Sequence, residues 1–235
     1  MMAIKEININ KISSQKDNVV QSFKNEIDVL SKLHHKNIIK YYGAYEKGDK
    51  LNILLEYCIA GSLYKLLEVY HHFKENIIRK FTFQILKGIE YLHSHHIMHR
   101  DIKAGNILID KHNHIYLIDF GLSSILGQNE ETTGSMGTIT YAPPEMYSNK
   151  TYSYSIDVWS MGVVLYYLYY GVMPFSKEKS TPYDVIENIR TKKLNFDIES
   201  ADKEEKKMIR VIKKCLVRDM KMRITAEEVS KMLSV

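Results

Sequence analysis

The alternation of apolar and polar positions predicts a chain whose character changes near Tyr57. Up to that residue the pattern reads strand, helix, strand, strand, and it starts with a short strand candidate over residues 2–9. An amphipathic helix is predicted over residues 18–33, where apolar side chains recur at helical spacing, and a buried strand over residues 51–57. Beyond Tyr57 helices dominate, with apolar stripes over residues 78–92 and 157–170 and a last helix opened by the capping box of Thr225 and Glu228.

Two charged residues stand out in these elements. Period-two alternation places Lys5 on the same face of the first strand as Ala3. Glu26 lies three residues after Phe23 and four before Leu30, so it borders the apolar face of the first helix. A carboxylate there either has a partner or is a solvated edge position. The spacing alone leaves these two interpretations evenly balanced.

A predicted hairpin gives the sharpest geometric inference. Residues 107–109 and 115–118 are short β runs on either side of a turn, and facing residue numbers should sum to about 224. Asn106 and Asp119 then meet at the open end of the hairpin, with Asp101 just upstream. Amide and carboxylate oxygens are the hard ligands that suit Mg²⁺. Converging groups of this kind indicate a site rather than a device that stabilises the fold.

Composition narrows the class of protein. The 235 residues, of which 45% are hydrophobic and 26% charged, suit one globular domain or two small ones. Two cysteines, Cys58 and Cys215, are too few for a secreted disulfide framework, and the first residues contain no apolar signal core. A cytoplasmic location is therefore expected, or alternatively a nuclear one. The longest nearly uncharged apolar run, residues 161–173, is shorter than the ~20 residues of a membrane span, so none is predicted.

Charge and histidine content add no further function. The net charge of +5 is scattered rather than gathered into a stripe, which disfavours nucleic-acid binding. His93, His95, His96 and His99 do not follow the spacing of zinc ligands, and no cysteine accompanies them. These histidines are interpreted as structural, and His93 as the end of a helical stripe.

Several motifs in series carry a family resemblance. The run His99-Arg100-Asp101-Ile102-Lys103-Ala104-Gly105-Asn106, followed by Asp119-Phe120-Gly121, Pro143-Pro144-Glu145 and Asp157-Val158-Trp159-Ser160, resembles the eukaryotic protein kinase family. Lys103 and Thr138 resemble the serine/threonine type, and residues 37–43 and 56–63 are most similar to upstream kinases of the mitogen-activated cascade and their sterile-type relatives. The resemblance implies an α+β, bilobal fold with a small antiparallel-sheet lobe over residues 1–57 and a mainly helical lobe over residues 58–235.

The resemblance also implies chemical roles. Asp101 looks like the catalytic aspartate that accepts the proton of the substrate hydroxyl, with Lys103 as its catalytic neighbour, and Asn106 and Asp119 look like Mg²⁺ ligands. The remaining roles concern ATP. Lys5 resembles the lysine that holds the phosphates of ATP, and Glu26 resembles the helix glutamate that pairs with this lysine. Ala3 and Leu108 resemble the residues on either side of adenine, and Leu55 resembles the residue behind it. Glu56 and Cys58 resemble the residues whose backbone groups bind adenine.

Other positions are assigned to the framework by the same resemblance. Ser62 stands where the family often reaches the ribose, although a helix N-cap explains it equally well. Among these framework residues, His99 and Phe120 are expected to stack in a spine with Leu30 and Tyr41. Arg100 is expected to bind a phosphate, and Glu145 and Arg223 are expected to form a buried ion pair. Asp157 is expected to anchor the catalytic loop.

The sequence departs from the family pattern in two places. The family has a Gly-rich loop before the strand lysine, and this chain starts four residues ahead of Lys5, so the first two strands of the smaller lobe are missing. We expect weakened ATP affinity and an exposed sheet edge from that departure. Residues 119–145 contain no lysine or arginine, and the phosphorylation candidates in this activation segment are Thr132, Thr133 and Ser135 beside Glu130 and Glu131.

Two function classes follow from the sequence. The leading hypothesis is a serine/threonine protein kinase that uses ATP and Mg²⁺ to phosphorylate a protein substrate, in a chain whose N-terminal edge is missing. The alternative is a pseudokinase, a scaffold that binds and regulates a partner protein without the Gly-rich loop. The presence of Lys5, Asp101, Asn106 and Asp119 favours the kinase. No oligomeric state is indicated.

Overall fold

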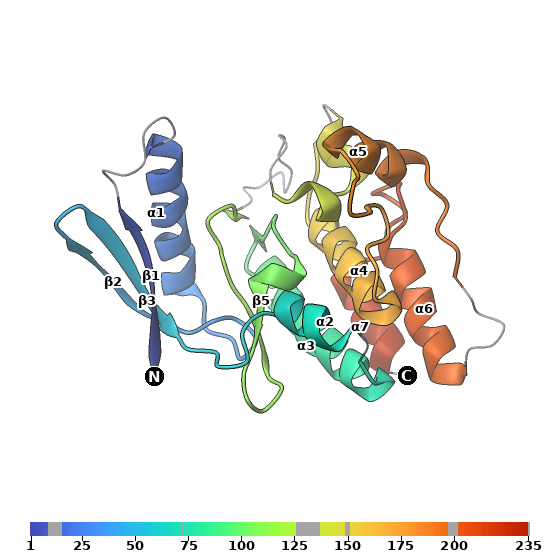
Figure 1. Ribbon diagram of the computed structural model, residues 1–235, viewed down its shortest axis with the longest axis horizontal. Coiled ribbons are helices and arrows are strands. Elements are labelled where there is room, and N and C mark those ends of the chain that lie inside the picture. Colours follow the sequence, from blue (N-terminus) through green and yellow to red (C-terminus); the bar gives the residue numbers. More distant parts are fainter. Residues whose placement is uncertain (9–15, 72, 126–136, 149–150, 197–201, 235) are drawn as a thin grey trace.

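The computed structural model describes residues 1–8, 16–71, 73–125, 137–148, 151–196 and 202–234. Its first part consists of β1 (Met2–Asn8), α1 (Lys16–Lys32), β2 (Tyr41–Lys47) and β3 (Lys50–Glu56). The three strands form an antiparallel sheet in the order β1-β3-β2. Figure 1 shows α1 lying alongside this sheet. The predicted order of strand, helix, strand, strand is therefore confirmed.

The predicted faces of this small lobe are also confirmed. Ala3, Lys5 and Ile7 are partly buried along β1, whereas Ile4 and Glu6 between them are exposed, as alternation requires. The β1–β3 register pairs Ala3 with Leu55 and Lys5 with Ile53. The strand was predicted to reach Ile9, which lies outside the described residues.

Helices make up most of the second part. They are α2 (Leu63–Tyr70), α3 (Glu75–Ser94), α4 (Ser155–Tyr170), α5 (Pro182–Thr191), α6 (Lys203–Cys215) and α7 (Ala226–Ser234). Helix α4 lies between α3 and α6 (Figure 1) and is buried along most of its length, which explains why its sequence is apolar on every side. The predicted capping box opens α7, since Thr225 N donates to Glu228 Oε2 at 2.8 Å and Glu228 N to Thr225 Oγ1 at 3.2 Å.

Short strands and turns fill the space between the sheet and the helices. Strands β5 (Ile107–Ile109) and β6 (Ile115–Leu117) pair in the predicted register, with Leu108 opposite Tyr116. Strand β4 (Ile97–Met98) pairs with β7 (Ser124–Ile125), and single 3-10 turns span Ala104–Asn106, Ile139–Tyr141 and Pro144–Tyr147. Asn37 and Ile39 bind Leu117 through their backbones, at 2.9 and 3.1 Å, and so tie the small lobe to the hairpin.

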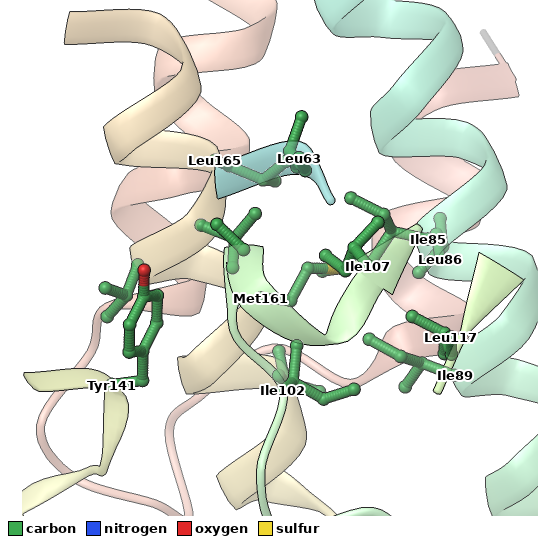
Figure 2. Packing of buried hydrophobic residues seen from close by; sticks show 14 of the residues in the cluster. Leu63, Ile85, Leu86, Ile89, Ile102, Ile107, Leu117, Tyr141, Met161 and Leu165 are labelled. Carbon is green, nitrogen blue, oxygen red and sulfur yellow. The ribbon is translucent and has the colours of Figure 1, made fainter. Parts of the chain in front are cut away.

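One continuous apolar core holds the hairpin on the helices. Figure 2 shows Ile85 and Ile89 of α3 beside Leu117 of β6, with Ile107 of β5 and Met161 of α4 completing the cluster, and all five side chains are fully buried. Truncating one such side chain to alanine typically costs about 2–5 kcal/mol. The loop that carries Asp101 and Asn106 is thus fixed at the edge of a rigid core.

The result is a bilobal α+β fold with a small sheet lobe and a mainly helical lobe. The boundary predicted at Tyr57 falls in the connection between β3 and α2. Among the described residues, no helix is both long enough and apolar enough to cross a membrane.

Candidate active site

Lys5 joins two carboxylates that come from distant parts of the chain. Its Nζ lies 2.6 Å from Glu26 Oε2 on α1 and 2.9 Å from Asp119 Oδ1, just beyond β6. Glu26 is 2% exposed, so the question that its spacing left open is answered: this carboxylate is buried and has Lys5 as a partner. Lys5 reaches both groups because β1 alternation turns it toward α1.

The charges of this trio are set by burial and by contact. Burial lowers the pKa of Lys5, but the Glu26 and Asp119 carboxylates more than compensate and leave that pKa raised. Burial likewise works against ionised Asp119, yet Lys5 holds the pKa of Asp119 below its ordinary value. For Glu26 burial outweighs the attraction of Lys5, so its pKa is raised. Lys5 is therefore a firmly charged ammonium group beside ionised Asp119.

A second cluster surrounds Asp101, which is 7% exposed. Lys103 Nζ lies 2.7 Å from Asp101 Oδ2, and Asn106 Nδ2 donates to the same oxygen at 2.9 Å. Thr138 donates to Oδ1 through its hydroxyl at 2.9 Å and through its backbone N at 3.1 Å. Lys103 Nζ also lies 2.8 Å from Thr138 Oγ1. These donors fix the orientation of the Asp101 carboxylate.

Gly137 allows Thr138 to approach this carboxylate. Its φ is +84°, and a Cβ atom at this position would lie 2.5 Å from the backbone oxygen of Arg100. A larger residue would therefore meet the catalytic loop and suffer backbone strain as well.

Asn106 and Asp119 flank the open end of the hairpin, as the predicted register requires. Ile118 N donates to Asn106 O at 3.0 Å, so the residue before Asp119 is directly bonded to Asn106. Asn106 Nδ2 donates to Asp101 O at 3.0 Å as well as to its carboxylate, and this turns the amide so that Oδ1 is the atom left for another ligand. Asp119 has a left-handed φ of 67°, a conformation that costs a non-glycine residue energy and often marks a functional site.

Asp157 on α4 anchors the backbone on the other side of Asp101. Its two carboxylate oxygens accept hydrogen bonds from His99 N and Arg100 N, both at 2.9 Å. His93 Nε2 lies 3.0 Å from Asp157 Oδ2. Burial opposes the ionisation of Asp157, but the contacts with His93 and His99 hold its pKa below the ordinary value. The His93 contact was missed by the sequence analysis, because helical spacing placed this side chain without identifying its partner.

His99, Phe120, Glu145 and Arg223 make contacts that agree with the framework roles implied by the resemblance. The rings of His99 and Phe120 lie 4.8 Å apart. Phe120 and Leu30 belong to the same buried cluster, and Tyr41 packs against that cluster. Glu145 and Arg223 form a buried, bidentate ion pair with contacts of 2.6 and 3.0 Å.

Arg100 instead contacts the backbone beyond Asp119. Its Nε donates to Leu122 O at 2.6 Å and its NH2 group to Ser123 O at 3.3 Å. The phosphorylation candidates Thr132, Thr133 and Ser135 lie outside the described residues, so phosphate binding by Arg100 stays a prediction.

The residues assigned to adenine come from β1, β3, β5 and the connection that follows β3. Leu55 lies opposite Ala3 in the β1–β3 register, and Cys58 is 7% exposed. Glu56 N donates to Lys40 O at 2.9 Å, and the adenine roles of Glu56 and Cys58 remain predictions. Ser62 forms a bridge with Leu108. The Ser62 hydroxyl also accepts a hydrogen bond from Lys65 N at 3.4 Å, which supports the N-cap interpretation. The ribose role of Ser62 remains a prediction.

Comparison with known proteins identifies the architecture. Residues 1–233 match the model of the protein kinase domain. The chain belongs to the protein kinase family. This kinase domain is 36% identical over 229 residues to the mitogen-activated protein kinase kinase kinase YODA of Arabidopsis thaliana, a match that covers 97% of this chain and 26% of that protein.

Two further relatives are also named as protein kinases. The kinase domain is 34% identical to mitogen-activated protein kinase kinase kinase 3 of Arabidopsis thaliana, over 97% of this chain and 36% of that protein. It is 40% identical to the serine/threonine-protein kinase STE11 of Saccharomyces cerevisiae, over 67% of this chain and 22% of that protein. The chain thus spans only about a quarter to a third of the length of these relatives. Members of the family use ATP and Mg²⁺ to phosphorylate proteins.

Proposed function

We propose that this kinase domain transfers the γ-phosphoryl group of ATP to serine or threonine hydroxyls of a protein substrate. The observation that carries the proposal is the bridge from Lys5 Nζ to both Glu26 and Asp119, at 2.6 and 2.9 Å. It holds a cation beside the carboxylate that we assign to Mg²⁺, which is the arrangement that the phosphates of ATP require. The Asp101 cluster is linked to this part of the fold through Asn106, whose amide donates to the Asp101 carboxylate at 2.9 Å.

The residues at the open end of the hairpin fit Mg²⁺. Asn106 Oδ1 and the Asp119 oxygen that does not bind Lys5 would hold the ion, since both are hard oxygen ligands. Bound Mg²⁺ would supply neutralisation of the phosphate charge. The Lys5 ammonium would bind the α- and β-phosphates, and Glu26 would keep that ammonium in place.

Asp101 would orient the acceptor hydroxyl and accept its proton. Its carboxylate is held by Lys103, Asn106 and Thr138, so little reorganisation is needed when a substrate arrives. General-base catalysis of this kind contributes roughly 10²–10⁴ in rate. Lys103 Nζ is placed beside both Asp101 and Thr138, where it would stabilise the negative charge that develops on the transferred group.

The names of the relatives support a narrower substrate. Because the similar proteins are called mitogen-activated protein kinase kinase kinases, we propose that the substrate is a mitogen-activated protein kinase kinase. A cytoplasmic location, with the nucleus as the alternative, would place the enzyme with such a substrate and with ATP.

Phosphate transfer can be tested directly. The chain is incubated with γ-labelled ATP, Mg²⁺ and a catalytically inactive mitogen-activated protein kinase kinase, and the labelled amino acids are identified. We expect phosphoserine and phosphothreonine, loss of label in Lys5→Met, and unchanged label in Lys47→Met, a matched change at an exposed lysine. No transfer to protein by the unaltered chain would favour the scaffold alternative, and phosphotyrosine alone would refute the assigned substrate class.

A further inference from the structure

One face of α1 lies against the backbone that follows Asp119. Asn25 Nδ2 lies 3.0 Å from Phe120 O, 3.3 Å from Gly121 O and 3.0 Å from Ser123 O. A single amide nitrogen carries only two protons, so the three carbonyls share them. Asn25 precedes Glu26, and the segment that it binds follows Asp119. Helix α1 and the segment that begins at Asp119 are therefore linked twice. Lys5 links them by charge, and Asn25 links them by neutral hydrogen bonds.

The packing around Gly121 shows how close this contact is. A Cβ atom at Gly121 would collide with the Ser22 hydroxyl and would lie 3.4 Å from the Ser22 carbonyl oxygen. Ser22 stands one helical turn before Asn25, on the same face of α1. The helix therefore touches the segment at two successive turns, with no room for a side chain between them.

The catalytic loop contacts the same short segment. Arg100 NH2 donates to Ser123 O at 3.3 Å, and Asn25 Nδ2 donates to that same oxygen at 3.0 Å. Arg100 immediately precedes Asp101. One carbonyl thus joins the helix that carries Glu26 to the loop that carries Asp101, although the partners are distant in sequence.

We propose that Asn25 is a positioning residue that couples the placement of α1 to the conformation of residues 120–123. Helix α1 cannot move away from the sheet without breaking the Asn25 bonds together with the Lys5–Glu26 contact. Conversely, a rearrangement of residues 120–123 would release α1 and withdraw Glu26 from Lys5. The Asn25 bonds carry no net charge, so this coupling should persist at salt concentrations that weaken exposed ion pairs.

The test compares two asparagines on one helix. Asn25→Leu keeps the branched shape and removes the amide donors, and Asn18→Leu makes the same change at an exposed position of α1. Hydrogen exchange is measured by mass spectrometry on the full chain. We expect exchange in both α1 and residues 120–123 to become about tenfold faster in Asn25→Leu, since about 1.4 kcal/mol of lost hydrogen bonding is a factor of ten. Asn18→Leu should leave residues 120–123 unchanged.

A second variant separates hydrogen bonding from packing. Asn25→Asp keeps the size of the side chain but turns oxygen atoms toward the carbonyls, so exchange should be accelerated at least as much as in Asn25→Leu. Exchange at residues 120–123 like that of the unaltered chain, in either variant, would overturn the proposal. So would faster exchange spread evenly over the whole chain, because that pattern reports general loss of stability.

The kinetic part of this inference rests on the proposed function. If phosphate transfer occurs, Asn25→Leu should lower kcat about tenfold, the factor that matches about 1.4 kcal/mol of lost positioning. Hydrogen exchange requires no ATP, so the two proposals fail separately. A chain without transfer activity but with the expected exchange pattern would refute the kinase and keep the coupling. An active chain without that exchange pattern would support the kinase and refute the coupling.

Discussion

Glu26 Oε2 and Lys5 Nζ lie 2.6 Å apart, yet the two side chains share their burial unequally. The glutamate side chain is 2% exposed, whereas the lysine side chain is 38% exposed. The cost of removing charge from water therefore falls on Glu26, which agrees with the raised pKa of that carboxyl group. We therefore expect this contact to contribute more to activity than to stability.

Neutralising Glu26 should separate activity from stability. Because burial raises the pKa of Glu26, ionising this carboxyl costs stability as the pH rises through that value, and Glu26→Gln removes the ionisable group. We expect kcat/KM for phosphate transfer to fall about tenfold or more and the melting temperature to change by less than about 4 °C. Glu6→Gln, at the exposed Lys50–Glu6 pair, is the control and should alter neither quantity. Unchanged kcat/KM in Glu26→Gln would contradict the assigned role.

The pair of Arg223 and Glu145 should behave in the opposite way. Both residues are buried, at 5% and 6% exposure, and their contact is bidentate. Arg223→Ala leaves an unpaired buried carboxylate and should lower the free energy of unfolding by about 3–5 kcal/mol. Urea denaturation measures this, and Lys231→Ala at the exposed Lys231–Glu227 pair should produce no measurable change. Equal effects of the two substitutions would show that burial does not decide the strength of these ion pairs.

Asp157→Asn should weaken the catalytic loop in a pH-dependent way. An amide in place of the carboxylate loses an acceptor for either His99 N or Arg100 N, at a cost of about 3 kcal/mol. The pKa of Asp157 lies below the ordinary value of 3.8, so its stabilising effect is present above that pH and is lost as the pH falls through the lower folded pKa. Unfolding measured from pH 3 to pH 7 should therefore show the largest difference at the upper end. A difference that grows as the pH falls would be the wrong sign.

Cys58 should be an unreactive thiol despite its place between the lobes. Burial, reinforced by Glu56 and Asp110, raises the pKa of Cys58 to about 11. Alkylation by iodoacetamide, followed by peptide mapping, should be about a hundredfold slower at pH 8 than for a thiol of pKa 9. The rate should increase about tenfold for each pH unit from 7 to 9, because the thiolate remains the minor form throughout. A rate that levels off within this range would contradict the raised pKa.

The sequence predicted the local arrangement of the site well. Period-two alternation put Lys5 on the same face of β1 as Ala3, and the hairpin arithmetic placed Leu108 opposite Tyr116. Both depend on short-range geometry, which neighbouring residues determine. The edge position of Glu26 was identified in the same way, but its spacing could not say whether a partner existed.

Contacts made by the docking of distant elements were not predictable in this manner. No sequence pattern singled out Asn25, because helical periodicity identifies a face without revealing what lies against it. The contact between His93 and Asp157 was missed for the same reason, since its partners lie on α3 and α4. The one available signal was the spacing of Ser22, Asn25 and Glu26 along a single face of α1.

The most direct test of the central claim is single-turnover phosphate transfer from ATP and Mg²⁺ by Asp101→Asn. The amide keeps the size of the side chain but cannot accept the proton of the acceptor hydroxyl. We predict that transfer to a serine or threonine substrate falls by roughly 10²–10⁴, while Asp49→Asn, a matched change at an exposed turn residue, retains full activity. Transfer by Asp101→Asn at the rate of the unaltered chain would contradict the account.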